Sequence, residues 1–244
     1  MKQFKLLIAG LVLVSSFTYA KGPKVPYTHE GFYTNAATQV AVNFVSVNDI
    51  KESLKDLPPM TVTFDIDDTV LFSSEYFHYG FTFGKELGWG ETPDEVLHNQ
   101  KFWDYVSEQE DKHSIPKKSA KDIIKMHMER GDKVVFITGR NPHSNEKNGI
   151  VNGTAKVLQK YFNLPATTPI WYTSSTPRDG FKYDKTYYMK KVGSKLHYGD
   201  SDEDILAAKE AGIRGIRVQR SYSSTNPQNL NGGYGEEVVI NSAW

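Results

Sequence analysis

Two aspartates separated by one residue are the clearest chemical signal in the chain. Asp65 and Asp67 directly follow a short apolar, β-branched run at residues 60–64. Two carboxylates this close repel each other unless a cation lies between them. Mg²⁺ is a hard cation that takes a few carboxylates together with water and phosphate oxygens. Asp200 and Asp204 follow a later apolar run, and we predict that these four acids converge on one magnesium site.

Such a set of acids is suited to phosphoryl transfer. An aspartate beside a metal ion can attack phosphorus, while a second carboxylate protonates the leaving oxygen and later deprotonates water. We assign the first role to Asp65 and the second to Asp67. The phosphoryl oxygens need positive charge and hydrogen-bond donors, which the Thr138 hydroxyl, loop N–H groups and one lysine would supply. Position alone leaves that lysine open among Lys182, Lys185, Lys190 and Lys191.

Apolar strand patterns and helix patterns alternate along the chain, and they must position these acids. We predict strands at residues 60–64, 133–137, 169–172, 195–198 and 215–218, and helices at 36–57, 117–130, about 153–162 and 202–211. This alternation predicts an α/β fold with a parallel, five-strand-centred, Rossmann-like sheet and helices on both faces. Ligands bind beyond the carboxyl ends of such strands, where Asp65, Thr138 and Asp200 all stand.

The remaining segments divide the chain. Residues 72–115 are rich in aromatic, glycine and charged residues without a clear period, so we expect a small, mostly helical cap-like insertion there. The tail at 220–235 is expected to be irregular. The predicted division is a leader, an arm with a helix and a catalytic domain, at residues 1–20, 21–58 and 59–244.

The first twenty residues have the layout of a signal peptide. Lys2 and Lys5 precede an apolar run at residues 6–14, and Ala20 offers a small residue for cleavage. The run is too short to span a bilayer, although an N-terminal membrane anchor is the alternative. The chain has no cysteine, which excludes a lipid-anchored lipoprotein and structural disulfides. We therefore expect a periplasmic protein without a membrane anchor.

The formal net charge is zero. A protein that binds a nucleic-acid polymer normally carries a basic excess. We therefore expect small-molecule phosphomonoesters as partners, and no nucleic-acid polymer.

Three segments carry a family resemblance. Residues 64–70, 137–140 and 199–205 resemble, in order, the first, second and fourth motifs of the haloacid-dehalogenase (HAD) superfamily. The acid at Asp67 resembles the phosphatase branch, because the dehalogenases lack it. More closely, the chain is similar to the class B acid phosphatases, bacterial periplasmic enzymes of broad specificity. This similarity runs from about Pro59 to the C-terminus and includes residues 71–74, 102–103, 114–116 and 235–242.

The resemblance implies a HAD-like fold and a metal site. One Mg²⁺ per subunit would be held by Asp65, Asp200 and the backbone carbonyl of Asp67, with Asp204 supporting the water shell of the ion. The resemblance also implies a homotetramer and an acidic pH optimum.

The resemblance further implies a substrate site. Thr138 and Lys185 would hold the phosphoryl group, with Lys185 just ahead of a short helix. Gly139 and Arg140 would complete the phosphoryl-binding loop. Arg140 would contact a phosphoryl oxygen or the leaving group, whereas a plain surface arginine is the alternative. An apolar pocket for the leaving group is expected from Phe77, Leu97, Trp103 and Tyr222.

Three segments depart from the family pattern. Residues 77–97 and 173–184 differ from the family in length. Asn226 occupies the position nearest to a family aromatic, with Tyr222 four residues earlier. These departures bear on the substrate pocket and leave the reacting residues unchanged.

Together these features predict a secreted, Mg²⁺-dependent phosphomonoesterase. It would hydrolyse nucleotides and other organic phosphomonoesters through an aspartyl-phosphate intermediate, with phosphotransferase side activity. Two alternatives remain open. One is a narrower 5′-nucleotidase on the same scaffold, and the other is a phosphate- or nucleotide-binding module without turnover.

Overall fold

The structure is a computed structural model that describes residues 42–145, 153–166, 168–174, 178–226 and 230–244. These residues belong to one compact unit, Thr34–Trp244. The predicted signal peptide and most of the predicted arm lie outside the described residues. No helix in the described ranges is long and apolar enough to cross a membrane.

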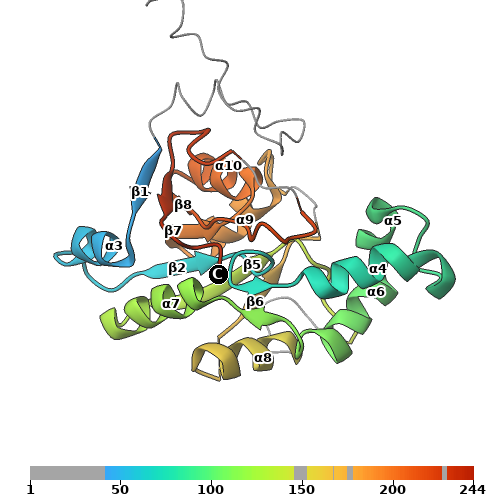
Figure 1. The fold of residues 1–244 in the computed structure, drawn as a ribbon. Coiled ribbons are helices and arrows are strands. Elements are labelled where there is room, and N and C mark those ends of the chain that lie inside the picture. Colours follow the sequence, from blue (N-terminus) through green and yellow to red (C-terminus); the bar gives the residue numbers. More distant parts are fainter. Residues whose placement is uncertain (1–41, 146–152, 167, 175–177, 227–229) are drawn as a thin grey trace, which may run out of the picture. The chain divides into compact units, whose positions relative to one another are not determined.

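A seven-stranded parallel sheet forms the centre of this unit (Figure 1), in the order β1-β9-β8-β7-β2-β5-β6. Phe64 at the end of β2 lies beside Phe136 of β5 and Tyr198 of β7, so these three strands end at nearly the same level. The strands are β1 (Asn43–Val45), β2 (Thr61–Phe64), β5 (Lys133–Thr138), β6 (Ile170–Tyr172), β7 (Ser194–Gly199), β8 (Arg214–Arg217) and β9 (Glu237–Val239).

The five predicted strands are confirmed, with ends that differ by one residue, and two further strands, β9 and the edge strand β1, extend the sheet beyond β8. The prediction of one helix over residues 36–57 is wrong in its described part. There the chain forms β1 and then the helix α3 (Val47–Leu54). Phe44 pairs in parallel register with Val238 of β9, a partner almost 200 residues away. Ser46 then starts the helix with a capping box.

Helices cover both faces of the sheet, as predicted. On one face lie α3, α7 (Lys118–Arg130) and α8 (Gly153–Phe162), and on the other lie α9 (Asp184–Lys191) and α10 (Asp202–Ala211). α9 was not predicted from the sequence pattern. The two faces bury separate apolar clusters, one around Phe64, Ile123 and Leu158 and one around Ile137 and Met189.

The insertion after β2 is mostly helical, as predicted. It contains α4 (Ser74–Leu87), α5 (Pro93–Leu97), α6 (Gln100–Tyr105) and the π-helix η1 (Val106–Glu110). Its two ends pair as the antiparallel strands β3 (Leu71–Phe72) and β4 (Ile115–Pro116).

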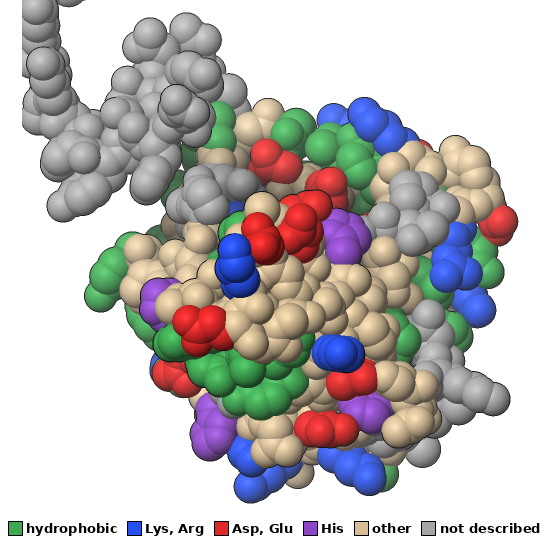
Figure 2. Space-filling view, turned by 90° about the vertical axis from the view of Figure 1, so that its right-hand side faces the viewer, with side chains coloured by type: hydrophobic (Ala, Val, Ile, Leu, Met, Phe, Trp, Pro, Cys, Tyr) green, Lys and Arg blue, Asp and Glu red, His purple; other side chains and the backbone are tan. Residues whose placement is uncertain are grey.

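An aromatic core of its own holds the insertion together. It includes Tyr76, Trp89 and Phe102. Gly80 lets two helices approach, because a Cβ there would lie 2.6 Å from the Phe102 ring. On the insertion side of the molecule, acidic, basic and histidine side chains are interspersed over the visible described surface (Figure 2).

Candidate active site

A cavity of about 560 Å³ lies at the carboxyl ends of β2, β5 and β7, beside the insertion. Because these strands are parallel and end at one level, residues far apart in the chain meet there. The cavity brings together all but one of the predicted site residues. These are Asp65, Asp67, Phe77, Leu97, Trp103, Thr138, Gly139, Arg140, Lys185, Asp200 and Asp204.

Asp65 is buried at the floor of the cavity, paired with Lys185. The Lys185 Nζ donates to Asp65 Oδ1 at 2.6 Å, and Lys185 is the second residue of α9 rather than a residue ahead of it. Burial raises the pKa of Asp65, Lys185 opposes this, and the neighbouring Asp204 and Asp200 raise it further. The Lys185 charge alone therefore does not offset the burial of Asp65 and its repulsion by the neighbouring acids.

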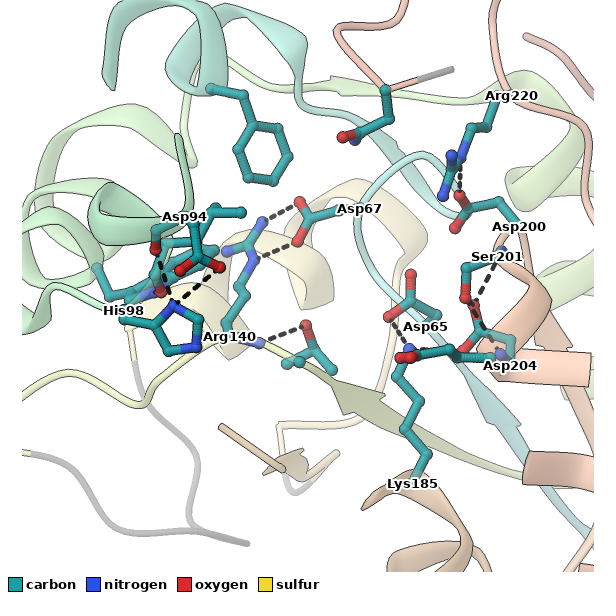
Figure 3. A pocket seen from close by; sticks show the side chains of 17 residues that line it. Asp65, Asp67, Asp94, His98, Arg140, Lys185, Asp200, Ser201, Asp204 and Arg220 are labelled. Atoms are coloured by element: carbon teal, nitrogen blue, oxygen red, sulfur yellow. Dashed lines mark hydrogen bonds and ion pairs between the residues drawn. The ribbon is translucent and has the colours of Figure 1, made fainter. Parts of the chain in front are cut away.

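Asp200 faces Asp65 across a threonine hydroxyl. Thr69 Oγ1 lies 2.8 Å from Asp200 Oδ1 and 3.2 Å from Asp65 Oδ2. One hydroxyl hydrogen cannot satisfy both carboxylates, so two buried acids meet here with one donor between them. The second Asp200 oxygen accepts from Arg220 Nε (Figure 3).

Asp204 is fully buried, and both of its oxygens accept hydrogen bonds from the protein. Oδ1 lies 2.5 Å from Lys185 Nζ and 3.1 Å from His197 Nε2. Oδ2 accepts from the backbone and the hydroxyl of Ser201, which caps α10. Burial would raise the pKa of Asp204, but Lys185 and His197 hold it well below its usual value. Gly199 makes room for this carboxylate, since a Cβ there would lie 2.2 Å from it.

The carboxylates of this cluster fit a hard cation. Asp65, Asp200 and Asp204 each offer an oxygen within 4.8 Å of the others. All are carboxylate oxygens, which Mg²⁺ prefers. Because the Asp204 oxygens already accept several hydrogen bonds, Asp65 and Asp200 are the better direct ligands. Asp204 is better suited to orienting Lys185 and metal-bound water.

The side chain of Asp67 turns away from this cluster toward Arg140 (Figure 3). Arg140 Nε and Nη2 each donate to one Asp67 oxygen at 2.8 Å, and the Tyr76 hydroxyl donates to the same carboxylate. Burial alone would raise the pKa of Asp67, but Arg140 outweighs it and lowers the pKa below its usual value. Arg140 itself is only 2% exposed, so the alternative of a plain surface arginine is excluded.

Thr138 and Gly139 also line the cavity. Thr138 is the last residue of β5 and is buried, with its Oγ1 accepting from the backbone N–H of Arg140 at 3.3 Å. The hydroxyl proton of Thr138 can therefore point to a ligand in the cavity.

The far end of the cavity is apolar on one side. Phe77, Leu97 and Trp103 from the insertion line it, as predicted. The prediction that Tyr222 forms a fourth wall is not met. Tyr222 is 90% exposed and contacts the ring of Trp244, and Asn226 lines the cavity instead. The loop turns Tyr222 outward because Asp68 accepts from Ser224 and Asn226, which draws this end of the loop inward.

Several cavity residues were not predicted from the sequence. They are Asp94, His98, Ser201, Glu203, Arg220 and Asn226. Ser201 could have been found, because a serine three residues before an acid is the signature of a capping box. Arg220 could also have been found, since it stands three residues past the end of β8 at the same edge of the sheet. Asp94 and His98 carry no local signal, since only the packing of the insertion brings them to the cavity.

Comparisons with known proteins identify similar chains. A family model described as "HAD superfamily, subfamily IIIB (Acid phosphatase)" matches residues 14–227. The chain is 43% identical to a class B acid phosphatase of Haemophilus influenzae over 98% of both chains. It is 41% identical to one of Aggregatibacter actinomycetemcomitans, again over 98% of both.

The fold also has solved relatives. The crystal structure of a predicted phosphoglycolate phosphatase from Haemophilus somnus is 14% identical and matches with a TM-score of 0.52, covering 75% of this chain and 94% of that one. At this identity the match supports the α/β HAD-like fold alone.

Proposed function

The chain belongs to the class B acid phosphatases of the HAD superfamily, and from this premise we propose that it is a secreted, Mg²⁺-dependent enzyme that hydrolyses organic phosphomonoesters through an aspartyl phosphate on Asp65. The observation that carries the proposal is the pairing of Asp65 with Lys185 on the floor of the cavity. A dianionic phosphoryl group would meet the nucleophile, the lysine and the Thr138 hydroxyl there.

Asp65 begins the reaction as the nucleophile. One of its oxygens attacks phosphorus, so that a new O–P bond forms and the bond from phosphorus to the leaving oxygen breaks. Asp67 must first take up a proton from solvent, because its ion pair with Arg140 favours the carboxylate and lowers its pKa. The leaving oxygen then takes this proton from the carboxyl group of Asp67. Lys185 and the Thr138 hydroxyl stabilise the negative charge on the phosphoryl oxygens.

Water completes the reaction. A water molecule attacks phosphorus, the bond from phosphorus to Asp65 breaks, and the Asp67 carboxylate accepts the proton that the water loses. Phosphate leaves, and both aspartates return to their starting forms. An alcohol in place of water would accept the phosphoryl group, which gives the proposed phosphotransferase side activity.

Mg²⁺ supplies positive charge next to the transferring phosphoryl group. Asp65, Asp200 and the backbone carbonyl of Asp67 would hold it, one ion per subunit, with Asp204 supporting its water. The buried, mutually repelling carboxylates of Asp65 and Asp200 support this assignment.

Aromatic side chains at the insertion end of the cavity support nucleotides and aryl phosphates as substrates. Trp103 and Phe77 have ring centroids 6.3 Å apart at nearly a right angle and line the cavity. Aromatic faces contribute about 1–3 kcal/mol per stacked base. No such gain is available to a small aliphatic leaving group.

Trp103→Ala is expected to raise KM for nucleoside monophosphates by roughly tenfold or more, which corresponds to ~1.4 kcal/mol. KM for glycerol phosphate should barely change, because glycerol has no ring to stack. The measurement is steady-state kinetics on a panel of nucleotides, sugar phosphates, aryl phosphates and glycerol phosphate. Wild-type turnover of nucleotides alone would instead identify a narrower nucleotidase.

A control is needed because Trp103 also donates from Nε1 to the Leu97 carbonyl at 2.7 Å. Trp103→Phe keeps an aromatic face but removes this hydrogen bond. We expect it to retain most of the nucleotide preference. If Trp103→Ala weakens both substrate types equally, Trp103 serves folding rather than binding.

The N-terminal segment supports export to the periplasm. The apolar run at residues 6–14 and the small residue Ala20 precede the expected cleavage site. Protein purified from the periplasm should begin near Lys21, as read by N-terminal sequencing or intact mass. Periplasmic protein that still begins at Met1 would contradict the proposed cleavage. The family resemblance supports a homotetramer, which gel filtration with light scattering would test.

A further inference from the structure

We infer that Asp111, which does not line the cavity, is a positioning residue for the reaction: it fixes the guanidinium of Arg140, which in turn holds the side chain of Asp67 toward the leaving group. The inference rests on the proposed role of Asp67 as acid and base. Asp111 contacts neither phosphorus nor the leaving oxygen in this scheme, and acts only through Arg140.

The forked guanidinium group of Arg140 binds two carboxylates, one on each side. Nε and Nη2 hold both oxygens of Asp67, and Nη1 donates to Asp111 Oδ1 at 2.8 Å. Arg140 and Asp111 are 2% and 1% exposed, so water does not compete for the contact between them, whereas the side chain of Asp67 is 17% exposed and faces the cavity. Contacts on both sides of a planar fork restrict its rotation. Without Asp111, only the Asp67 side of the fork would be held by a carboxylate.

Asp111 is itself held by a second partner. Thr154 Oγ1 of α8 donates to Asp111 Oδ2 at 2.5 Å. The backbone N–H of Asp111 bonds to the Val106 carbonyl, which closes the π-helix η1. A π-turn within a helical segment often marks a functional site. Here it places Asp111 at the end of the insertion, between α8 and the loop that follows β5.

The result is a buried chain of contacts from α8 to the reacting acid. It runs from Thr154 through Asp111 and Arg140 to Asp67. The rings of Tyr76 and Trp103 lie 5.3 Å and 5.9 Å from the guanidinium carbon of Arg140. The same arginine thus contacts the insertion that carries the leaving-group pocket and the acid that protonates the leaving group. Asp111 is the group that ties the arginine to the end of this insertion.

The orientation of Asp67 is the property that Asp111 should control. Proton transfer to the leaving oxygen depends on hydrogen-bond geometry between that oxygen and the acid. A misplacement of about 1 Å in an active site can cost a hundredfold in rate. Leaving groups that need protonation, such as the alkoxide of glycerol phosphate, should therefore be sensitive to Asp111. p-Nitrophenolate leaves readily without a proton and should be much less sensitive.

The test compares kcat and KM for these two esters in wild type, Asp111→Ala and Asp111→Asn. For Asp111→Ala, kcat with glycerol phosphate should fall by roughly tenfold to a hundredfold, and with p-nitrophenyl phosphate by less than about threefold. Asp111→Asn should recover part of the loss, because its Oδ1 can still accept from Arg140 Nη1. KM for both esters and the dissociation constant for Mg²⁺ should stay close to wild type.

Two further variants separate the possible outcomes. Asp132→Asn removes a buried charge from a cluster with His127 and Arg130 that lies before β5, away from the cavity. It should lower the melting temperature without changing the ratio of the two kcat values. Asp67→Asn, measured in parallel, should lose much more kcat with glycerol phosphate than with p-nitrophenyl phosphate, because it removes the acid itself.

Equal loss for both esters in Asp111→Ala and Asp111→Asn, with Asp67→Asn still selective, would overturn the inference and leave the proposed function standing. A wild-type enzyme without phosphatase activity, or an Asp67→Asn variant without selectivity, would overturn both. If Asp111→Ala does not fold, the inference is tested with Asp111→Asn instead, by the ratio of its kcat for glycerol phosphate to its kcat for p-nitrophenyl phosphate.

Discussion

Replacement of Asp65 by asparagine is expected to lower kcat for every phosphomonoester by several orders of magnitude. The amide of asparagine is not a nucleophile, and the covalent route has no other carboxylate placed to replace it. Among the described residues, Asp200 is bound by Thr69 and Arg220, and both oxygens of Asp204 accept hydrogen bonds from the protein. The measurement is kcat with p-nitrophenyl phosphate. Its leaving group needs no proton, so kcat reports on the nucleophile and little on the acid.

The fold of the Asp65→Asn variant should persist. Lys185 keeps a partner in Asp204, so its buried charge is not left without a counter-ion. Asp132→Asn is a matched control, because it neutralises a buried aspartate that pairs with an arginine away from the cavity. At a temperature where it is folded, that variant should keep wild-type kcat.

A trapping experiment tests independently whether Asp65 is the nucleophile. Acid quenching during turnover of radiolabelled substrate should leave label on the wild-type chain and none on Asp65→Asn. Substantial turnover by a folded Asp65→Asn variant would contradict the assignment of the nucleophile.

Removal of divalent cations should abolish activity, and Mg²⁺ should restore it. Burial raises the pKa of Asp65, and the neighbouring acids raise it further against the opposing charge of Lys185. A divalent cation between Asp65 and Asp200 would offset this repulsion and keep the nucleophile ionised. The measurement is kcat after treatment with EDTA and after back-titration with Mg²⁺. Full activity of protein shown to be metal-free by elemental analysis would contradict the prediction.

Mg²⁺ should also stabilise the fold, which provides a readout that does not depend on turnover. A ligand that binds only the folded state adds about 2.7 kcal/mol at a hundred times its Kd. The melting temperature of the wild-type protein should therefore rise with Mg²⁺. Asp200→Asn should lose most of this rise, whereas Asp132→Asn should keep it. An equal rise in all three proteins would place the ion elsewhere.

Local sequence pattern was enough to predict the central sheet and the acids that meet at its edge. Buried parallel strands form continuous apolar runs, so 133–137 and 195–198 could be recognised from local pattern alone. Asp65, Thr138 and Asp200 stand at the ends of such runs. Because parallel strands end at one edge, their convergence followed from the order of the elements before any contact was known.

Short strands at the edge of the sheet depended on distant partners. Residues 43–45 have apolar spacing compatible with a helix, and they became β1 only because β9 offers a parallel partner from the other end of the chain. Strand pairing of this kind is non-local, so it cannot be predicted from a short stretch of the sequence. The same holds for β9 itself, which is three residues long.

Side-chain partners within the site were decided by the tertiary structure. Four lysines fitted the sequence pattern, but the packing of α9 against α10 puts Lys185 between Asp65 and Asp204. The hydrogen bonds of Asp68 turn Asn226 rather than Tyr222 into the cavity. The sequence thus determined which chemical groups reach the edge of the sheet, because that depends on local period and chain order. Which group each one touches depends on packing between segments far apart in the chain, and only the folded structure contains that information.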